Sequence, residues 1–198
     1  MRPDQSGRAA EVFALAFHTD PSSIATVPDP VERARIMPLI GAWNIRLGLM
    51  YGEVLVTDGN LDGVLTVFTS EREGELEESV DDTIGELAER MGPEAWARNE
   101  ELWPVWDIPH ERMKEAVGEP HWYVDMLAVD PAWQGMGIGS ALLQVVSDRA
   151  DSDGRPCALF TYSERNVRLY ERRGYEVVHA GETPIISIPY WCMKRPSK

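Results

Sequence analysis

The segment from Gln134 to Ser140 has the residue types and the spacing of a loop that binds phosphate groups. Three glycines alternate at Gly135, Gly137 and Gly139, between a run expected to form a strand and a run expected to form a helix. Glycine lets the backbone turn its N–H groups outward, and a helix N-terminus attracts an anion such as a pyrophosphate. A tight turn that binds nothing is the alternative, and it leaves the alternation of the glycines unexplained.

The spacing excludes two common nucleotide-binding loops. A Rossmann loop has the pattern G-x-G-x-x-G in the first strand-to-helix turn, whereas these glycines follow G-x-G-x-G far along the chain. A P-loop needs Gly-Lys followed by Ser or Thr, which this segment lacks. The expected anion therefore belongs to a different cofactor.

Two segments of the chain, taken together, resemble the acetyl-CoA motif of the GNAT superfamily of N-acetyltransferases. The first reads Q-x-x-G-x-G over residues 134–139 and follows L-x-V-x-P over residues 127–131. The second begins at Asn166 and continues with LYERRGY over residues 169–175. The two segments together are far more specific than either of them alone.

Within the superfamily the chain is most similar to the puromycin N-acetyltransferases. This closer resemblance is carried by ALAF at residues 14–17 with DP at 20–21, EPHW at 119–122, YER at 170–172 and WCM at 191–193. It implies one GNAT domain over residues 1–198, in which residues 71–118 form a helical segment on the acceptor side. Family members usually open with a strand before the first helix, and we expect that strand to be short or missing here.

The resemblance implies that acetyl-CoA is the co-substrate and that no metal takes part. The strand before the loop would pair through its backbone with the pantetheine arm, and the loop would hold the pyrophosphate. Asn166 would lie near the thiol end of the cofactor. The cofactor-binding residues predicted in this way are Leu127, Ala128, Val129, Gln134, Gly135, Met136, Gly137, Ile138, Gly139, Ser140, Asn166 and Tyr170.

Tyr170 is the candidate general acid, because the resemblance places it beside the departing sulfur. A thiol has a pKa of ~8.5 and a phenol one of ~10, so full proton transfer is uphill by about 2 kcal/mol. We therefore expect Tyr170 to act mainly as a hydrogen-bond donor to the forming thiolate. A packing tyrosine on a short helix is the alternative. A backbone N–H near residues 127–129 is the candidate for polarising the thioester carbonyl.

Asp125 is the candidate for handling the amine proton. A carboxylate in so apolar a strand is unusual, since such groups are rarely buried without a partner. The two-residue period of a strand places Tyr123, Asp125 and Leu127 on one face. Asp125 would take the amine proton, directly or through water, or bind an ammonium; a structural, hydrogen-bonded Asp is an equally open alternative. His121 and Glu100 are weaker base candidates.

The elements around these residues predict an α/β domain of the α+β type. The resemblance specifies a mixed, mostly antiparallel sheet with a splayed parallel pair in the middle, flanked by helices. Residue periodicity favours strands over residues 52–57, 64–69, 123–129, 157–162, 175–179 and 190–194. It favours helices over residues 8–17, 29–43, 139–149 and 166–173, and a helical pattern over 83–117. Pro38 is expected to kink or split its helix, and the acidic residues 71–82 to form a solvated loop or a helix start.

Composition narrows the class of partner. The formal net charge of −14 argues against nucleic acid, whose phosphates require a basic surface. The same charge suits a cationic amine in an acidic cleft, although a surface that is merely soluble would carry it as well.

No apolar run approaches the ~20 residues that span a membrane, and two cysteines are too few for a disulfide scaffold. We expect a cytoplasmic monomer or homodimer.

The predicted function is acetyl-CoA-dependent N-acetylation of a small-molecule primary amine, such as an aminonucleoside like puromycin. Trp96, Trp103, Trp106 and Trp122 are candidates for an aromatic slot around it, although core packing explains any one of them as well. The absence of an evident base favours an α-amine of pKa ~8 over a lysine-like amine of ~10.4. A peptide or protein amine, or an acyl-CoA-binding module without catalysis, are the alternatives.

Overall fold

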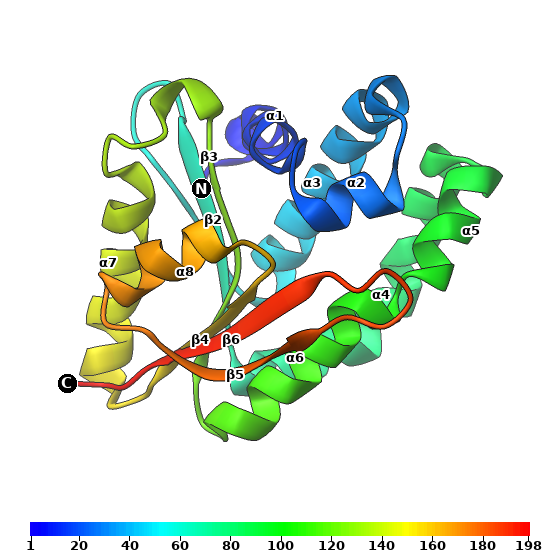
Figure 1. Cartoon of the computed structure of the whole chain (residues 1–198). Helices are drawn as coiled ribbons and strands as arrows, with labels where there is room; N and C mark the ends of the chain where they lie inside the picture. Colours follow the sequence, from blue (N-terminus) through cyan, green and yellow to red (C-terminus); the bar gives the residue numbers. More distant parts are fainter.

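A twisted sheet divides the molecule, and helices pack on both of its faces (Figure 1). The computed structural model describes residues 1–198, apart from the side chains of residue 3 and residues 76–82. The strands are β1 Glu53–Val56, β2 Gly63–Thr69, β3 Trp122–Val129, β4 Cys157–Thr161, β5 Glu176–Glu182 and β6 Pro189–Arg195. In the described residues the sheet has the order β1-β2-β3-β4-β6-β5, and every neighbouring pair is antiparallel except β3 and β4. The predicted fold class is therefore confirmed.

The parallel pair in the middle of the sheet separates soon after it begins. The partners are Trp122 with Cys157 and Tyr123 with Ala158, and the register recorded between β3 and β4 ends there. Each strand continues toward its C-terminal end with its outer neighbour, β2 or β6. The two strands therefore diverge and leave an opening between their C-terminal halves.

One extra residue interrupts β3 where this opening begins. Thr66 of β2 pairs with Met126, whereas the next residue, Val67, pairs with Val124. Asp125 is thus the additional residue of a β-bulge, a feature that bends a strand and redirects its side chains. It is solvent-exposed between two buried neighbours.

The helices form a layer on each face of the sheet. Their bounds are α1 Ser6–Phe17, α2 Pro21–Thr26, α3 Pro30–Tyr51, α4 Ser70–Met91, α5 Pro93–Glu101, α6 Pro104–Val117, α7 Ile138–Asp153 and α8 Glu164–Glu171. One core joins α7 and α8 to the sheet, through residues such as Leu143, Val146 and Val167. On the opposite face, α1 and α3 pack against β1–β3, and α6 packs against β3, β4 and β6.

Two expectations about helices were each left with two alternatives, and the structure decides between them in part. Pro38 does not split its helix, because α3 continues through it from Pro30 to Tyr51. The helix starts where predicted, with Pro30 in its first turn and Asp29 accepting a hydrogen bond from the Glu32 N–H at 2.7 Å. The acidic residues 71–82 form a helix start and not a loop, because they belong to α4, which begins at Ser70.

The N-terminal residues lead directly into the first helix. Residues 3–5 form a 3-10 turn before α1, and the Met1 ammonium donates a hydrogen bond to the Val54 carbonyl of edge strand β1 at 3.2 Å. In the described part of the chain, no helix combines the length and the apolar character needed to cross a membrane.

Candidate active site

The glycine loop forms the entrance to α7, where the sequence predicted an anion site. Gly135 and Gly137 have φ angles of +82° and +87°, in a region that residues with a Cβ rarely adopt. Gly137 is the N-cap of α7, and no side chain caps the helix there. The N–H groups of the first turn, at Ile138 to Ser140, therefore remain free to bind a phosphate.

Polar side chains hold this loop against the end of β3. The Gln134 side-chain amide donates a hydrogen bond to the Val129 carbonyl at 3.1 Å. Asp130 accepts from the Ala132 N–H at 3.0 Å and pairs with the Arg8 guanidinium of α1 at 2.6 Å. Hydrogen bonds from Ala132 and Arg8 keep the pKa of Asp130 below its usual value. Gln134 thus positions the loop with its side chain, a role that the motif alone did not specify.

The predicted pantetheine strand is the diverging half of β3. Ala128 is fully buried toward α1 and α3, whereas Leu127 and Val129 are half-buried. Leu127 packs on the α7 side, where a Cβ on Gly139 would lie 3.5 Å from it. Because β4 has separated from β3 here, an extended ligand can pair with the strand as an added strand does.

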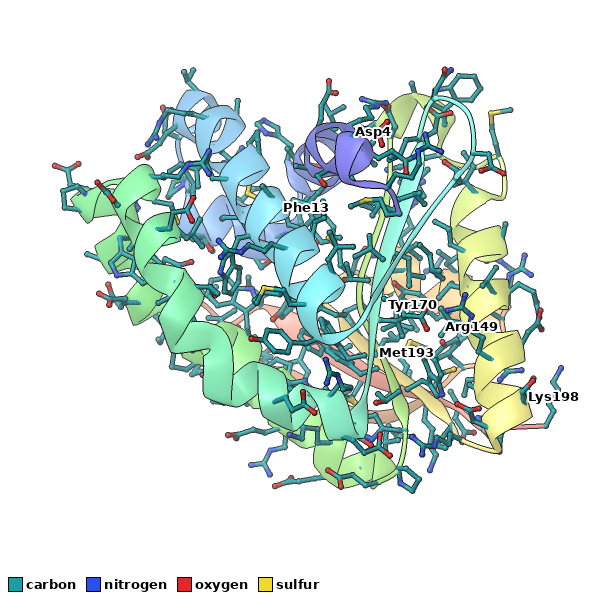
Figure 2. The ribbon with its side chains drawn as sticks, turned by 180° about the vertical axis from the view of Figure 1, so that it is seen from behind. Asp4, Phe13, Arg149, Tyr170, Met193 and Lys198 are labelled. Atoms are coloured by element: carbon teal, nitrogen blue, oxygen red, sulfur yellow. The ribbon has the colours of Figure 1, made fainter. Side chains whose placement is uncertain are left out.

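Asn166 and Tyr170 come from α8, which follows β4 across the opening. The Asn166 side-chain amide donates to Thr161 Oγ1 at 3.3 Å. Tyr170 lies one turn further along and is 7% exposed, in the core shared with α7. Its ring is 5.8 Å from that of Tyr175, and Figure 2 shows it in the interior above Met193. The structure thus brings α8 and the loop to the two sides of one opening.

The surroundings of Tyr170 keep its phenol protonated. Burial raises the pKa of Tyr170 above its usual value, and the Asp20 carboxylate raises it further. Asp20 is the N-cap of α2, where its side chain accepts from Ser22 N–H at 3.0 Å and from Ser22 Oγ at 2.6 Å. A phenol with a raised pKa keeps its proton at neutral pH, so its hydroxyl is available as a hydrogen-bond donor to a forming thiolate.

Asp125 lies among polar side chains on the side of the sheet that faces α3 and α6. Thr66 Oγ1 donates to Asp125 Oδ2 at 3.0 Å, and the Tyr123 hydroxyl also donates to this carboxylate. Loss of solvation raises the pKa of Asp125, although these hydrogen bonds and the nearby His110 lower it. A carboxylate that is reached by solvent, but whose pKa is raised because its charge is poorly solvated, is typical of a group at the base of a cleft.

The expected shared face of Tyr123, Asp125 and Leu127 is wrong. Tyr123 packs in the core under α6, whereas Leu127 packs on the α7 side. The bulge at Asp125 adds one residue, and so reverses the alternation of all the residues that follow it. Tyr123 and Asp125 still meet, through their hydrogen bond.

One member of the predicted tryptophan slot lies elsewhere. Trp122 belongs to the α7 side of the sheet, where its indole N–H donates to Asp153 Oδ2 at 3.0 Å. The aromatic side chain in contact with Asp125 is Tyr123, whose ring stacks on that of Phe160 at 6.3 Å. Sequence reasoning missed Phe160 because only the strand order brings β4 beside β3.

Comparison with known proteins agrees with this geometry. Residues 102–177, which run from the residue after α5 to the second residue of β5, match the model of a family described as an acetyltransferase (GNAT) domain. This part of the chain is therefore similar to a GNAT acetyltransferase domain. The matched residues of this domain include the glycine loop, Asp125, Asn166 and Tyr170, and the match supports an acetyltransferase enzyme.

Solved structures share the fold of the acetyltransferase domain over nearly the whole chain. A Corynebacterium glutamicum protein described as histone acetyltransferase HPA2 and related acetyltransferase superposes with a TM-score of 0.68 and 21% identity, over 100% of this chain and 94% of its own. An agmatine N-acetyltransferase superposes at 0.60 with 16% identity, over 99% and 96%. A Staphylococcus aureus N-acetyltransferase gives 0.60 with 14% identity, over 98% and 96%. At such identities the likeness concerns the fold.

A curated relative matches a shorter part of the sequence. An uncharacterized N-acetyltransferase of Schizosaccharomyces pombe is 39% identical over 54 residues, which are 27% of this chain and 23% of that protein. The match therefore spans about a quarter of the relative's length. Among the described residues of the acetyltransferase domain, no group of three or more His, Cys, Asp or Glu side chains is arranged to hold a metal ion.

Proposed function

We propose that the protein transfers an acetyl group from acetyl-CoA to a small-molecule primary amine, by direct attack of the amine on the thioester. The observation that carries this proposal is the opening between β3 and β4, with an anion-binding helix end at one side and a protonated tyrosine at the other. Acetyl-CoA supplies the acetyl group as a thioester. Backbone N–H groups of Ile138 to Ser140 bind its pyrophosphate, and the diverging half of β3 aligns its pantetheine arm.

In this proposal the side chains divide the proton handling between them. Asp125 binds the ammonium form of the acceptor, because its carboxylate is accessible and faces no lysine or arginine among its recorded partners in the described structure. Tyr170 donates a hydrogen bond to the sulfur as the C–S bond breaks. The thiolate ends protonated, and Tyr170 recovers its own proton from the nitrogen of the new amide.

The acceptor proposed is a small α-amino compound, with puromycin as the first candidate. Support comes from the half-buried Phe160, whose ring stacks on that of Tyr123, the buried hydroxyl donor to Asp125. The resemblance of the short segments at residues 14–21, 119–122, 170–172 and 191–193 to puromycin N-acetyltransferases suggests the same candidate.

The test is release of free thiol from acetyl-CoA with a panel of acceptors. The panel contains puromycin, amino acids, polyamines including agmatine, and lysine peptides. The thiols of the protein do not disturb the assay, because burial raises the pKa of Cys157 to about 11 and that of Cys192 to about 12. Release with puromycin supports the full proposal, and release with another amine alone supports acetyl transfer while removing puromycin. Acetyl-CoA binding without release from any amine contradicts the proposal.

A further inference from the structure

A buried carboxylate and two histidines form a polar cluster behind the acceptor pocket. Glu73 of α4 is 1% exposed, and its two carboxylate oxygens face different imidazoles. Glu73 Oε1 lies 2.7 Å from His110 Nε2 of α6, and Glu73 Oε2 lies 3.0 Å from His121 Nε2. Burial alone would raise the pKa of Glu73, but the two imidazoles outweigh it and leave the pKa below its usual value.

The contacts of His121 determine where its protons lie. His121 Nδ1 is 2.9 Å from the Gly118 carbonyl, which can only accept, so Nδ1 carries a proton. Its Nε2 lies 3.0 Å from Glu73 Oε2, but the two atoms form no hydrogen bond and have no other partner among the described side chains. Since His121 is completely buried, it cannot touch a substrate.

The contact of His110 with Glu73 determines which of its ring nitrogens can accept a proton. The lowered pKa of Glu73 keeps its carboxylate ionised, so Oε1 accepts the 2.7 Å hydrogen bond and His110 Nε2 donates it. The nitrogen of His110 that is left to accept a proton is therefore Nδ1. Its side chain is 23% exposed, in contrast to the 2% of the Glu73 side chain that fixes it.

His110 also lies beside the pocket of the acceptor. Its ring is 4.8 Å from that of Tyr123 and 6.4 Å from that of Phe160, the two aromatic residues at the base of the pocket. Its charge, when present, is felt by the Asp125 carboxylate. The groups that surround this imidazole are thus Glu73 from α4, Tyr123 and Asp125 from β3 and Phe160 from β4. A proton arriving on Nδ1 is stabilised by Asp125.

We propose that His110, oriented by the buried Glu73, is the general base that deprotonates the acceptor ammonium bound at Asp125. The ammonium releases one proton to His110 Nδ1, and its lone pair forms the C–N bond to the acetyl carbon as the C–S bond breaks. The second proton leaves the nitrogen for the sulfur through Tyr170, and His110 returns the first to solvent. His110 is a catalytic residue in this scheme, and Glu73 and His121 are positioning residues. The proposal depends on the amine acetylation proposed above.

The experiment compares two acceptors in the wild type and in His110→Gln. One is the best amine of the panel, and the other is an aminooxy compound of similar size, whose nitrogen is unprotonated at pH 7. General-base catalysis contributes ~10²–10⁴-fold, so we expect kcat/KM for the amine to fall about 100-fold. For the aminooxy compound we expect a change within about 3-fold. An equal loss on both acceptors, or no loss on the amine, overturns the proposal.

Two further variants separate chemistry from folding. His179→Gln is the matched control, because His179 Nε2 also makes one side-chain hydrogen bond, to Tyr190 Oη at 3.2 Å, and should leave both rates unchanged. If His110→Gln does not fold, His110→Ala is assayed with added imidazole, which should restore turnover of the amine alone. Failure of imidazole to restore it in a folded variant counts against the base.

An NMR measurement that needs no turnover tests the tautomer of His110 separately from the proposed amine acetylation. Long-range ¹H–¹⁵N spectra should show His110 as the neutral Nε2–H tautomer, with its signals assigned by their loss in His110→Gln. The Nδ1–H tautomer would overturn the assignment even if the wild type proves active. If the wild type acetylates none of the amines, the amine acetylation fails, and the tautomer still decides the state of His110.

Discussion

The two sides of the proposed active site are built from different parts of the chain. The proposed cofactor side consists of one continuous stretch, from the end of β3 through the glycine loop into α7, and its groups are mostly backbone N–H and C=O. The proposed acceptor side consists of single side chains from β2, β3, β4, α4, α6 and the N-cap of α2. A cofactor site of the first kind tolerates changes of side chain, whereas an acceptor site of the second kind can change its substrate by one substitution.

The largest expected effect is at Tyr170, where the two sides meet. Tyr170→Phe removes the hydroxyl and keeps the ring that packs near Tyr175, so the fold and the cofactor side should remain intact. We expect kcat to fall by about 100-fold or more, as for the loss of one donor to a developing charge. Stopped-flow or steady-state thiol release measures this rate, and calorimetry with acetyl-CoA checks that the affinity stays within about 3-fold. A matching loss of acetyl-CoA affinity would show that Tyr170 belongs to the cofactor side only.

The second effect separates activity from stability at Asp125. The raised pKa of Asp125 means that its ionised form is less favourable in the folded than in the unfolded chain. This cost is present at pH values above the folded pKa, and it disappears as the carboxyl is protonated on acidification. Asp125→Asn should lower kcat/KM for the amine about 30-fold, because the bound ammonium loses one charge-assisted contact of ~2 kcal/mol.

The stability of the same variant should not fall with its activity. Thr66 can still donate to the side-chain amide oxygen that replaces the carboxylate, so we expect the Tm at pH 7 to be unchanged or slightly raised. Differential scanning calorimetry measures it. A Tm that falls together with activity would assign Asp125 a structural role and leave the ammonium without its proposed partner.

A third test compares the two ends of α7. Gly137 and Gly154 both have left-handed backbone conformations, with φ of +87° and +67°, and neither has an atom within 4 Å of an added Cβ. Alanine at either position should cost ~1–2 kcal/mol of folding stability. Only Gly137→Ala should also raise the KM for acetyl-CoA, by about 10-fold, because it lies in the phosphate loop. Equal KM changes in both variants would remove the loop from the cofactor site.

The smallest effect lies outside both sides, where the end of β6 meets the end of α7. Two hydrogen bonds from the buried Arg195, at 2.7 and 2.9 Å, and one from the Lys198 backbone lower the pKa of Asp151 to about 2. A lowered folded pKa gives stability that is present above the unfolded pKa and is lost as the pH falls from about 4 to 2. Asp151→Asn should lower the Tm by about 2–4 °C at pH 7, and by much less near pH 2. Thiol release should not change.

The place in the fold of the proposed cofactor residues could be predicted from the sequence because local spacing determines it. The alternating glycines follow β3 and lead into α7, and Asn166 and Tyr170 lie on α8, which follows β4. Two features of the acceptor side could not be predicted from local sequence patterns. One is the bulge, which reverses the expected alternation of side chains after Asp125. The other is the approach of α4 to α6, which brings Glu73 into contact with His110, 37 positions away in the sequence.

Pro38 shows how packing overrides a sound local rule. A proline inside a helix removes one hydrogen bond and crowds the preceding turn, at a cost of ~3 kcal/mol. The continuous α3 is nevertheless fixed along its length, with Met37 and Ile45 buried against α1 and the sheet, and Ile36 against α4. Burial of several such side chains at ~1.5–3 kcal/mol each is larger than the cost of the proline.

The bulge also makes the length of β3 a determinant of the proposed site, separately from its composition. Without Asp125, Val124 and Met126 would follow each other and pair with Val67 and Thr66 in regular register, so Met126 and Ala128 would keep the face opposite Leu127 and Val129. The deletion would remove the carboxylate proposed to meet the amine, together with the local bend of the strand. The extra residue thus adds one polar side chain to the middle of the sheet and leaves the apolar residues after it on the faces that a regular strand would give them.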